Sequence, residues 1–592
     1  MTTADTTGNH KQMDSPIKKI ILIKPPIEDF YDTPVRQLPL GLGYLKSCIS
    51  LFFPTIKIII KDYHSDGIVR SPKKTSIPLP QELSYLKKFY PFHNQGPFST
   101  FSHYYHFGAS YNEIINDLVT EHRRSPIDII GISSLFTAYY HEVVTITKLI
   151  KQQLSPSPWI VLGGPHPSSC PEEVIAENSI DFVIRGEGER PFVKLVATLS
   201  EAAPYNFNQI PNLVFKQHTH LSPPLSPPQI IFNPIEDNFP LDQIPYPDLS
   251  DLVSKLEDNK SITYPPISIS MITSRGCIYK CRFCSIRSVF GDSYRQRAVE
   301  DVLAEIELRL QQGHSAINFE DDHLAANKHF FSSLLKGIIE HTNGNIPLSA
   351  MNGICYWHLD DSSLQLMKKA GFNSLNLALV TTNKSILEQQ RRPGNKEKFI
   401  EVVRLAQQLK FEIVAYLILG LPNEDIDSTI ETLVTLSELP LLIGASIFYS
   451  TPGMSLEELG VTSADYRLCR HTAMTHTTNP DHPPHSPFLL SREEIFTLFN
   501  LVRIINFIKG MELPRGHHRL HNQQRTQLGG ELLQRLLHEG KLYGYNKNGA
   551  FLLEKFSSAV FQKFWSKIQF IKTQSGEFID KELLCVIYKI HK

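Results

Sequence analysis

The chain has 592 residues, so several domains are expected rather than one. Its formal net charge of -1 gives no electrostatic basis for binding nucleic acid or an anionic membrane surface. The polar N-terminus lacks the apolar core of a signal peptide, and no apolar run is long enough to cross a bilayer. We therefore expect a cytoplasmic protein with no membrane span and no nucleic-acid partner.

Residues 1–17 are expected to form a disordered tail, and apolar runs alternate with helical stretches over residues 18–205. The predicted strands are KIILIK, IKIIIKDY, IDIIGISSL, WIVLGG and IDFVIRGEGE. Strands that alternate with helices predict a parallel sheet with helices on both faces. An insertion at about 65–124, rich in His, Tyr and Phe, separates the second and third strands. Segments of that length usually have a function or structure of their own.

Prolines crowd the stretch 206–266, and their density predicts a linker without regular structure. Over residues 267–455 six further apolar runs alternate with helical stretches, which predicts a full or partial parallel β/α barrel. The chemistry of such a barrel lies where its strands end. Residues 456–592 are predicted to be mainly helical, with REEIFTLFNLVRIINFIKGM as the strongest segment.

Three of the eight cysteines, Cys277, Cys281 and Cys284, cluster in SRGCIYKCRFCSIR, just after the first strand of the predicted barrel. Thiolates are soft ligands for zinc, copper(I) or iron–sulfur clusters. Structural zinc normally takes four ligands, and His323, which could be the fourth, belongs to another strand. Three cysteines on one loop can instead hold three irons of a [4Fe–4S] cube and leave the fourth iron open. The other cysteines are scattered, so no disulfide framework is expected.

The segment CIYKCRFC matches the CxxxCxxC signature of the radical S-adenosylmethionine (SAM) superfamily, including the aromatic Phe283 before the last cysteine. This resemblance implies that Cys277, Cys281 and Cys284 hold a [4Fe–4S] cluster whose open iron binds SAM. An electron delivered to the cluster then cleaves SAM to methionine and a 5′-deoxyadenosyl radical. A small electron donor such as flavodoxin or ferredoxin is the implied partner.

Two later segments also resemble the family. INFEDDH resembles the second-strand motif, so Glu320, Asp321 and Asp322 are candidates to meet the SAM ammonium group, because an ammonium needs an anionic acceptor. Acids after a strand also cap the next helix, which is the alternative for each of them. YLILGLPNED resembles the fifth-strand segment, in which Gly420 would let the backbone approach the adenine.

The fourth strand departs from the family pattern. Many relatives carry a Gly-Ile-Glu-Ser type sequence there, whereas this chain has LNLALVTTN. Val380 takes the place of the acid, and Thr381 follows it. Asn376 on the same strand is a candidate polar substitute that would contact SAM, although a buried asparagine can equally be structural.

The first domain is similar to the cobalamin (B12)-binding domain that precedes the barrel in one large radical SAM class. The matching segments are LPLGLGYL, GISSL, VLGGPH and VIRGEGE. The resemblance implies that Ser133, Leu135, Gly163 and Gly164 admit the nucleotide tail of cobalamin, because glycines let a ligand approach the backbone. The alternative is that the Gly-Gly pair only makes a tight turn.

The segment DYHSDG fits the Asp-x-His-x-x-Gly pattern in which some cobalamin proteins offer histidine as the lower cobalt ligand. In those proteins the pattern follows the first strand, whereas here it follows the second. We therefore expect His64 to be a polar loop histidine rather than a cobalt ligand.

These resemblances imply an α/β protein with an N-terminal Rossmann-like cobalamin-binding domain, a radical SAM barrel and a helical C-terminal region. The implied cofactors are a [4Fe–4S] cluster, SAM and cobalamin. The implied activity is methylation of an unactivated carbon of a small-molecule substrate. The alternatives are a radical rearrangement or cyclisation without methyl transfer, and a non-catalytic cobalamin-binding protein. A methylthiotransferase is disfavoured, because only Cys48 and Cys170 stand in the first half to hold a second cluster.

Overall fold

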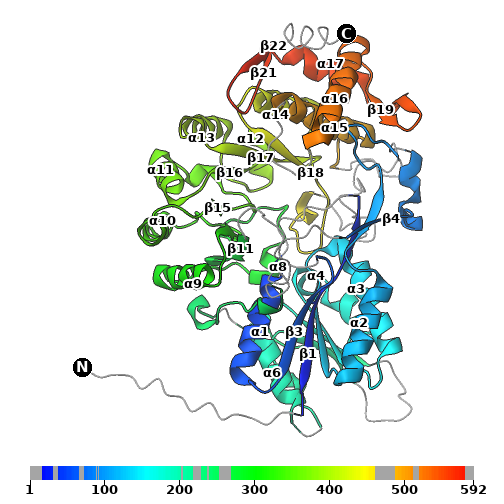
Figure 1. The fold of residues 1–592 in the computed structure, drawn as a ribbon, viewed down its shortest axis with the longest axis vertical. Helices are drawn as coiled ribbons and strands as arrows, with labels where there is room; N and C mark the ends of the chain where they lie inside the picture. The colour runs from blue at the N-terminus through cyan, green and yellow to red at the C-terminus, as the bar shows by residue number, and fades with distance from the viewer. Residues whose placement is uncertain are drawn as a thin grey trace.

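The computed structural model describes residues 16–30, 38–65, 73–88, 90, 93–201, 204–217, 228–236, 239–252, 268–459, 487–510 and 519–580. Figure 1 shows an N-terminal α/β domain at one end, a second α/β domain in the middle and the C-terminal elements at the other end. None of the helices in these ranges is long and apolar enough to span a membrane.

The N-terminal domain is built on a seven-stranded sheet of order β10-β9-β8-β7-β6-β1-β3. Five of its strands are parallel: β1 (Lys19–Lys24), β3 (Lys57–Asp62), β6 (Ile129–Ser133), β7 (Trp159–Gly163) and β8 (Phe182–Ile184). Helices lie on both faces: α1 (Leu40–Phe52) and α6 (Glu189–Leu199) on one, α2 (Tyr111–Arg124), α3 (Tyr140–Gln153) and α5 (Pro171–Ala176) on the other. Continuous apolar runs suit strands that are covered on both faces. The predicted parallel sheet is confirmed.

Two further strands extend this sheet with antiparallel pairing. They are β9 (Leu213–Gln217) and β10 (Gln229–Phe232), and both fall in the stretch where the sequence predicts a linker. The prolines of this stretch lie outside the two strands, so the ladder of each strand keeps its donors. Regular structure therefore continues past the expected end of the first domain.

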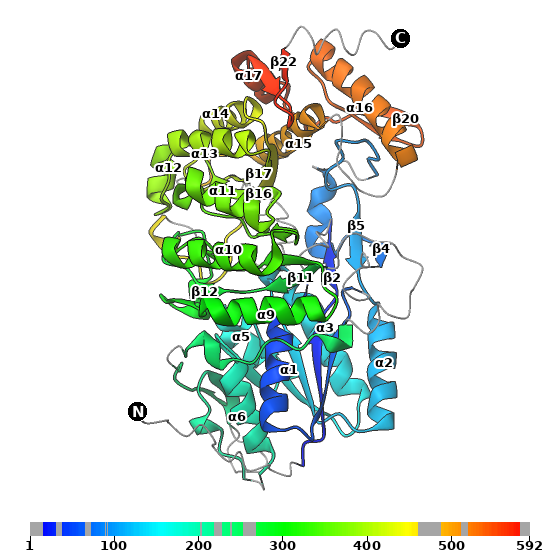
Figure 2. The ribbon, with the colours of Figure 1, turned by 60° about the vertical axis from the view of Figure 1, so that its left-hand side comes forward.

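Two strands of the insertion, β4 (Lys74–Ile77) and β5 (Tyr104–Phe107), form a small antiparallel sheet of order β2-β5-β4 with β2 (Ile27–Asp29), which follows β1. The short helix η2 (Gln81–Lys88) lies between β4 and β5. Aromatic rings of the insertion pack against α15 (Arg492–Lys509), with 5.3 Å between the ring centroids of Phe98 and Phe507. In Figure 2 β4 and β5 lie between the N-terminal domain and the C-terminal elements.

The second domain has six parallel strands in two groups of three, β11-β14-β15 and β16-β17-β18. They are β11 (Ser268–Met271), β14 (Ala316–Phe319), β15 (Leu348–Ser349), β16 (Ser374–Val380), β17 (Glu412–Leu419) and β18 (Leu442–Ile447). Isolated parallel bridges at Leu348–Phe372 and Ile354–Leu377 link the two groups. This confirms the partial form of the predicted barrel.

The helices of this domain form its outer layer, in which α9, α10, α11 and α13 rise one above another in Figure 2. They are α9 (Val299–Gln311), α10 (Lys328–Thr342), α11 (Asp361–Ala370), α12 (Lys384–Gln389), α13 (Lys396–Gln408) and α14 (Ile426–Ser437). Most begin at an Asn or Asp N-cap, whose side chain satisfies a free backbone N–H of the first turn.

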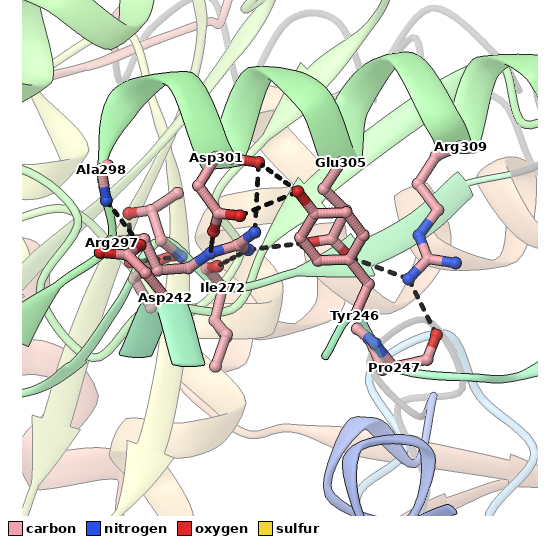
Figure 3. Close-up of polar contacts among 11 residues, drawn as sticks. Asp242, Tyr246, Pro247, Ile272, Arg297, Ala298, Asp301, Glu305 and Arg309 are labelled. Carbon is pink, nitrogen blue, oxygen red and sulfur yellow. Dashed lines mark hydrogen bonds and ion pairs between the residues drawn. The ribbon is translucent and has the colours of Figure 1, made fainter. Parts of the chain in front are cut away.

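Polar contacts join the segment before β11 to α9 (Figure 3). The Glu305 carboxylate is fully buried and accepts hydrogen bonds from Arg297 at 2.5 Å and Arg309 at 2.8 Å. Arg309 Nη2 also donates to the Pro247 carbonyl oxygen at 2.8 Å. The Tyr246 hydroxyl donates to the Asp301 carboxylate at 2.8 Å. The expected linker is therefore held against the second domain at this point.

The C-terminal elements are α15, α16 (Arg519–Glu539), α17 (Ser558–Lys567) and two hairpins. The hairpins are β19 (Tyr543–Asn546) with β20 (Gly549–Leu552), and β21 (Phe570–Lys572) with β22 (Phe578–Asp580). Ser491 and Glu494 form a capping box at the start of α15. The Asn506 side chain bonds both backbone groups of Ile443, which satisfies the outer edge of β18.

Candidate active site

The cysteine loop, residues 277–293, begins at a hairpin formed by β12 (Ser274–Gly276) and β13 (Tyr294–Gln296). Gly276 has a φ of +82°, and a Cβ there would lie 2.1 Å from the Ser293 carbonyl oxygen, so this turn requires glycine. Its N–H donates to Asp322 Oδ2 at 3.0 Å. The cysteines of this loop are free thiols, as are all those in the described ranges. Three soft donors on one loop fit an iron–sulfur cluster.

The thiols lie in a largely buried environment. Cys281 is 9% exposed, and burial raises the pKa of Cys284 to about 11. Within the described ranges no group of three His, Cys, Asp or Glu side chains is spaced to hold a single metal ion. The His323 ring packs on the rings of Tyr279 and His358.

Arg392 places a positive charge beside the cysteine loop. Its Nη1 donates to Cys281 Sγ at 3.8 Å, and its Nη2 donates to the Ala378 carbonyl oxygen at 2.5 Å. The guanidinium also lies over the rings of Trp357 and Phe283, at 4.9 and 5.7 Å. It forms no ion pair with a carboxylate in the described part of the chain. A cation so placed favours an anion at this loop, such as a thiolate-bound cluster.

A hydrogen-bonded aromatic group holds the loop from the barrel side. The Tyr279 hydroxyl accepts a hydrogen bond from Trp357 Nε1 at 2.9 Å and lies 2.7 Å from His358 Nε2. The tautomer of His358 sets the direction of this second hydrogen bond. Burial lowers the pKa of His358, which agrees with a neutral ring.

The three acids after β14 point to different partners. Asp321 is buried and accepts from the hydroxyls of Thr273 and Ser274 at 2.6 and 2.5 Å, so its oxygens tie β14 to the start of β12. Asp322 holds the start of the cysteine loop, and burial raises its pKa to about 7. Glu320 accepts from Asn318 Nδ2 at 2.5 Å at the strand end. The Asp322 carboxylate thus bonds Gly276, the residue that immediately precedes the cysteine loop.

The ends of β16 and β17 form the next part of the site. Asn376 lies on β16 and is 9% exposed, and Gly420 follows β17 with a φ of +83°. Phe283 of the cysteine loop packs against an apolar cluster that includes Val380 and Leu421. The structure thus brings Phe283, from the cysteine motif, to the strand ends beside Gly420.

A strained residue marks the end of β16. Val380 has a φ of +80° and lies at an irregularity in the β16–β17 pairing. A positive φ is a genuine outlier for a β-branched side chain, and such residues gather at functional sites. Next to it the Thr381 hydroxyl donates to Glu424 Oε1 at 2.6 Å. Burial raises the pKa of Glu424 to about 8.

The residues predicted to receive cobalamin lie together where β6 and β7 of the N-terminal sheet end. Ser133 pairs with Gly163 across β6 and β7, and Leu135 is 52% exposed just beyond β6. A Cβ at Gly163 would find its nearest neighbour only at 3.8 Å, whereas one at Gly164 would lie 2.8 Å from the Ser134 carbonyl oxygen. The first glycine leaves open space and the second makes the turn.

Ser134 adds a polar group that the sequence did not single out. Its hydroxyl is buried and has no hydrogen-bond partner within the described ranges. Buried polar groups without partners are rare in native folds and require an explanation. The carboxyl ends of β6 and β7, with Ser133, Ser134, Gly163 and Gly164, are called the glycine edge below. The orphaned hydroxyl of Ser134 and the open space at Gly163 fit a cofactor tail at this place.

His64 lies after β3, the strand at the edge of the sheet, and away from β6 and β7. Its side chain is 1% exposed, so it is buried, whereas the sequence predicts a polar loop histidine. A Cβ at Gly108 would lie 2.9 Å from the Cα of His64, because the backbone of the insertion closes over this residue. Its role toward cobalt stays a prediction.

The two halves of the site meet through two short helices. α4 (Pro165–Ser169) starts directly after Gly164, and α8 (Arg287–Phe290) lies within the cysteine loop. Ser169 Oγ donates to Ser288 Oγ at 2.7 Å, which joins these helices. The glycine edge therefore lies beside the cysteine loop, as the positions of α4 and α8 in Figure 1 show.

Two family models match the chain. The radical SAM superfamily model matches residues 271–436, and the B12 binding domain model matches residues 103–196. The first range holds the cysteine loop and Gly420, and the second holds Ser133, Ser134 and Gly163.

Three known proteins illustrate the similarity. Cytidylyl-2-hydroxyethylphosphonate methyltransferase of Streptomyces wedmorensis is 22% identical, over 68% of this chain and 73% of that protein. An uncharacterized methyltransferase of Pyrococcus horikoshii is 27% identical, over 70% of this chain and 77% of that protein. The solved structure of TsrM, a radical S-adenosylmethionine methyltransferase of Kitasatospora setae with cobalamin and a [4Fe–4S] cluster bound, superposes with a TM-score of 0.56. The two chains are 15% identical, and the superposition covers 87% of this chain and 95% of the TsrM chain.

The fold, the cysteine loop and the glycine edge thus agree with the two family models. The cofactors of such a protein are a [4Fe–4S] cluster, SAM and cobalamin. The chain is therefore a radical SAM enzyme that carries a B12-binding domain in front of its radical SAM domain.

Proposed function

We propose that this enzyme is a cobalamin-dependent methyltransferase that methylates an unactivated carbon atom of a small molecule. The observation that carries the proposal is the contact between α4 and α8, where Ser169 and Ser288 lie 2.7 Å apart. This contact brings the glycine edge of the B12-binding domain next to the cysteine loop. Methyl transfer needs both cofactors to reach one carbon atom, and this arrangement supplies that proximity.

The cofactors, when bound, supply reductive cleavage of SAM to methionine and a hydrogen-abstracting 5′-deoxyadenosyl radical, together with a methyl group for transfer. The three thiols of the cysteine loop would hold three irons, and the Arg392 guanidinium would offset negative charge at Cys281. Asp322 fixes the start of the loop through the Gly276 N–H. At the other edge the Ser134 hydroxyl would meet the cobalamin tail that passes Gly163.

The names of the two relatives described above support methyl transfer as the reaction. The relatives from Streptomyces wedmorensis and Pyrococcus horikoshii are both named methyltransferases. The electron for SAM cleavage would come from a small redox protein such as flavodoxin or ferredoxin. The two methyltransferase names favour methylation over rearrangement or cyclisation.

The test uses SAM with a deuterated methyl group. The reconstituted chain is incubated with this SAM, dithionite and a small-molecule extract of cells that carry its gene. A methyltransferase of this kind consumes SAM twice, so labelled product should form with nearly equal amounts of S-adenosylhomocysteine and 5′-deoxyadenosine. The Cys277→Ala variant is the control and should form neither product nor 5′-deoxyadenosine. A new product that carries no label and forms without S-adenosylhomocysteine would establish rearrangement or cyclisation instead.

A further inference from the structure

The base of the cysteine loop carries two arginines that face each other. In the hairpin of β12 and β13, Arg275 pairs directly with Arg295. Arg275 is 6% exposed and immediately precedes Gly276 and Cys277. Like charges directly opposite each other destabilise a pair of strands. The hairpin therefore depends on a counter-ion.

The counter-ion comes from the other domain. Glu187 accepts from Arg275 Nη1 at 2.5 Å through one carboxylate oxygen and from Arg295 Nη2 at 2.6 Å through the other. Glu189, the first residue of α6, accepts from Arg275 Nη2 at 2.6 Å. Both glutamates are buried. Loss of one partner from such a group leaves a buried charge uncompensated. The arginines of one domain and the glutamates of the other therefore depend on each other for charge compensation.

The segment that carries Glu187 and Glu189 also contacts α8, the short helix within the cysteine loop. A Cβ at Gly186 would lie 3.1 Å from the Val289 carbonyl oxygen of α8, so the two backbones are in close approach. The Gly186 N–H donates to Ser168 Oγ in α4 at 2.8 Å. Residues 186–189 thus contact α4 beside the glycine edge, as well as both the base and the helix of the cysteine loop.

We propose that Glu187 is a positioning residue that holds the cysteine loop at a fixed place relative to the glycine edge. One carboxylate bonds both strands of the hairpin at once, so it fixes the orientation of the hairpin as well as its distance. The loop that carries Cys277, Cys281 and Cys284 starts at that hairpin. The proposal rests on the two cofactor sites and holds whether the transferred group is methyl or not.

The test measures the distance between the two cofactors in the full chain. Both cob(II)alamin and the reduced cluster have an unpaired electron, so pulsed EPR reports their separation as a distribution. In Glu187→Gln we expect iron and cobalamin contents equal to wild type and a distribution at least twice as broad. A distribution that matches wild type overturns the proposal. Because this readout needs no substrate or product, failure of the methylation test leaves it unaffected.

Asp292→Asn is the matched control. Asp292 is an exposed carboxylate of the same loop that pairs with Lys280 and Arg287, both within its own domain. This variant should keep the wild-type distribution. Arg295→Gln is the second test variant, because it breaks one bond to Glu187 and keeps the bridge between Arg275 and Glu189. It should broaden the distribution by less than Glu187→Gln does.

Hydrogen exchange provides a readout that needs no cofactor and separates the proposal from a loss of folding. In Glu187→Gln, exchange should rise severalfold across residues 277–293 while it stays at the wild-type level in β6 and β7. Asp292→Asn should leave both regions unchanged. Equal exchange of residues 277–293 in wild type and Glu187→Gln overturns the proposal even if the variant binds too little iron for EPR.

Discussion

Glu424 is a buried carboxyl whose protonation should control stability. It lies in the loop between β17 and α14 and is 1% exposed. Its Oε1 accepts from the Thr381 hydroxyl at 2.6 Å, whereas its Oε2 has no hydrogen-bond partner in the described part of the chain. Burial disfavours the charged form and raises the pKa of Glu424 to about 8. The residue is thus a neutral acid at pH 7.

The size of the effect follows from that pKa. The shift from 4.5 to about 8 corresponds to about 5 kcal/mol, because each unit is worth about 1.4 kcal/mol. The folded chain holds this proton more tightly than the unfolded chain does. The contribution is therefore complete below pH 4.5 and is lost as the pH rises through 8. Between pH 5 and pH 8 the loss amounts to about 3–4 kcal/mol.

Glu424→Gln isolates this contribution, because glutamine is neutral at every pH and keeps an acceptor for Thr381. We expect the stability of wild type relative to the variant to fall by about 3–4 kcal/mol from pH 5 to pH 8. Urea unfolding of the full chain across that range measures it. Glu431→Gln on the neighbouring α14 is the control, since Glu431 is an exposed carboxylate near Lys567. Stability curves of wild type and Glu424→Gln that run parallel would refute the reasoning.

Three further predictions concern separate parts of the molecule. Cys277→Ala should abolish the cluster absorbance after anaerobic reconstitution, and a retained four-iron cluster would contradict the assignment. His64→Ala should leave the EPR spectrum of bound cob(II)alamin unchanged because β3 is the edge strand, and a loss of nitrogen hyperfine splitting would show that His64 binds cobalt. Glu305→Ala should lower the free energy of unfolding by about 3–5 kcal/mol because it leaves Arg297 and Arg309 buried without their partner. Glu307→Ala on the same helix should change it by less than about 0.5 kcal/mol, and an equal loss in both variants would refute the argument.

The parallel core of both domains could be predicted because its signal is local. Runs such as KIILIK are apolar on both faces, and that composition is typical of a strand covered from both sides. The sheet of β2, β4 and β5 could not be predicted in this way. It pairs Ile27 with Phe107, eighty positions later, and no local pattern selects that partner. β9 and β10 were missed because the prolines beside them masked two short strands.

The same distinction holds for the site. The spacing of Cys277, Cys281 and Cys284 is a local pattern, so the sequence could indicate the cluster loop. Arg392 meets Cys281 from 111 positions away, and Glu187 meets Arg275 from 88 positions away. Such contacts depend on how the domains fold and dock. The segment RGEGE weakly indicates cationic partners for its two acids, because buried carboxylates are costly unless a cation pairs with them.

A carboxyl from another segment lies at the end of the fourth strand of the second domain, β16. The resemblance to radical SAM proteins leads us to expect an acid where this sequence has Val380, and β16 itself contains none. The structure brings Glu424 to this point from the loop after β17, and Thr381 holds it there. The strained φ of Val380 fits this arrangement, because the irregular strand end turns Thr381 toward the loop. A carboxyl thus lies beside the end of β16 through tertiary contact, although burial keeps it neutral where an acid on the strand would carry charge.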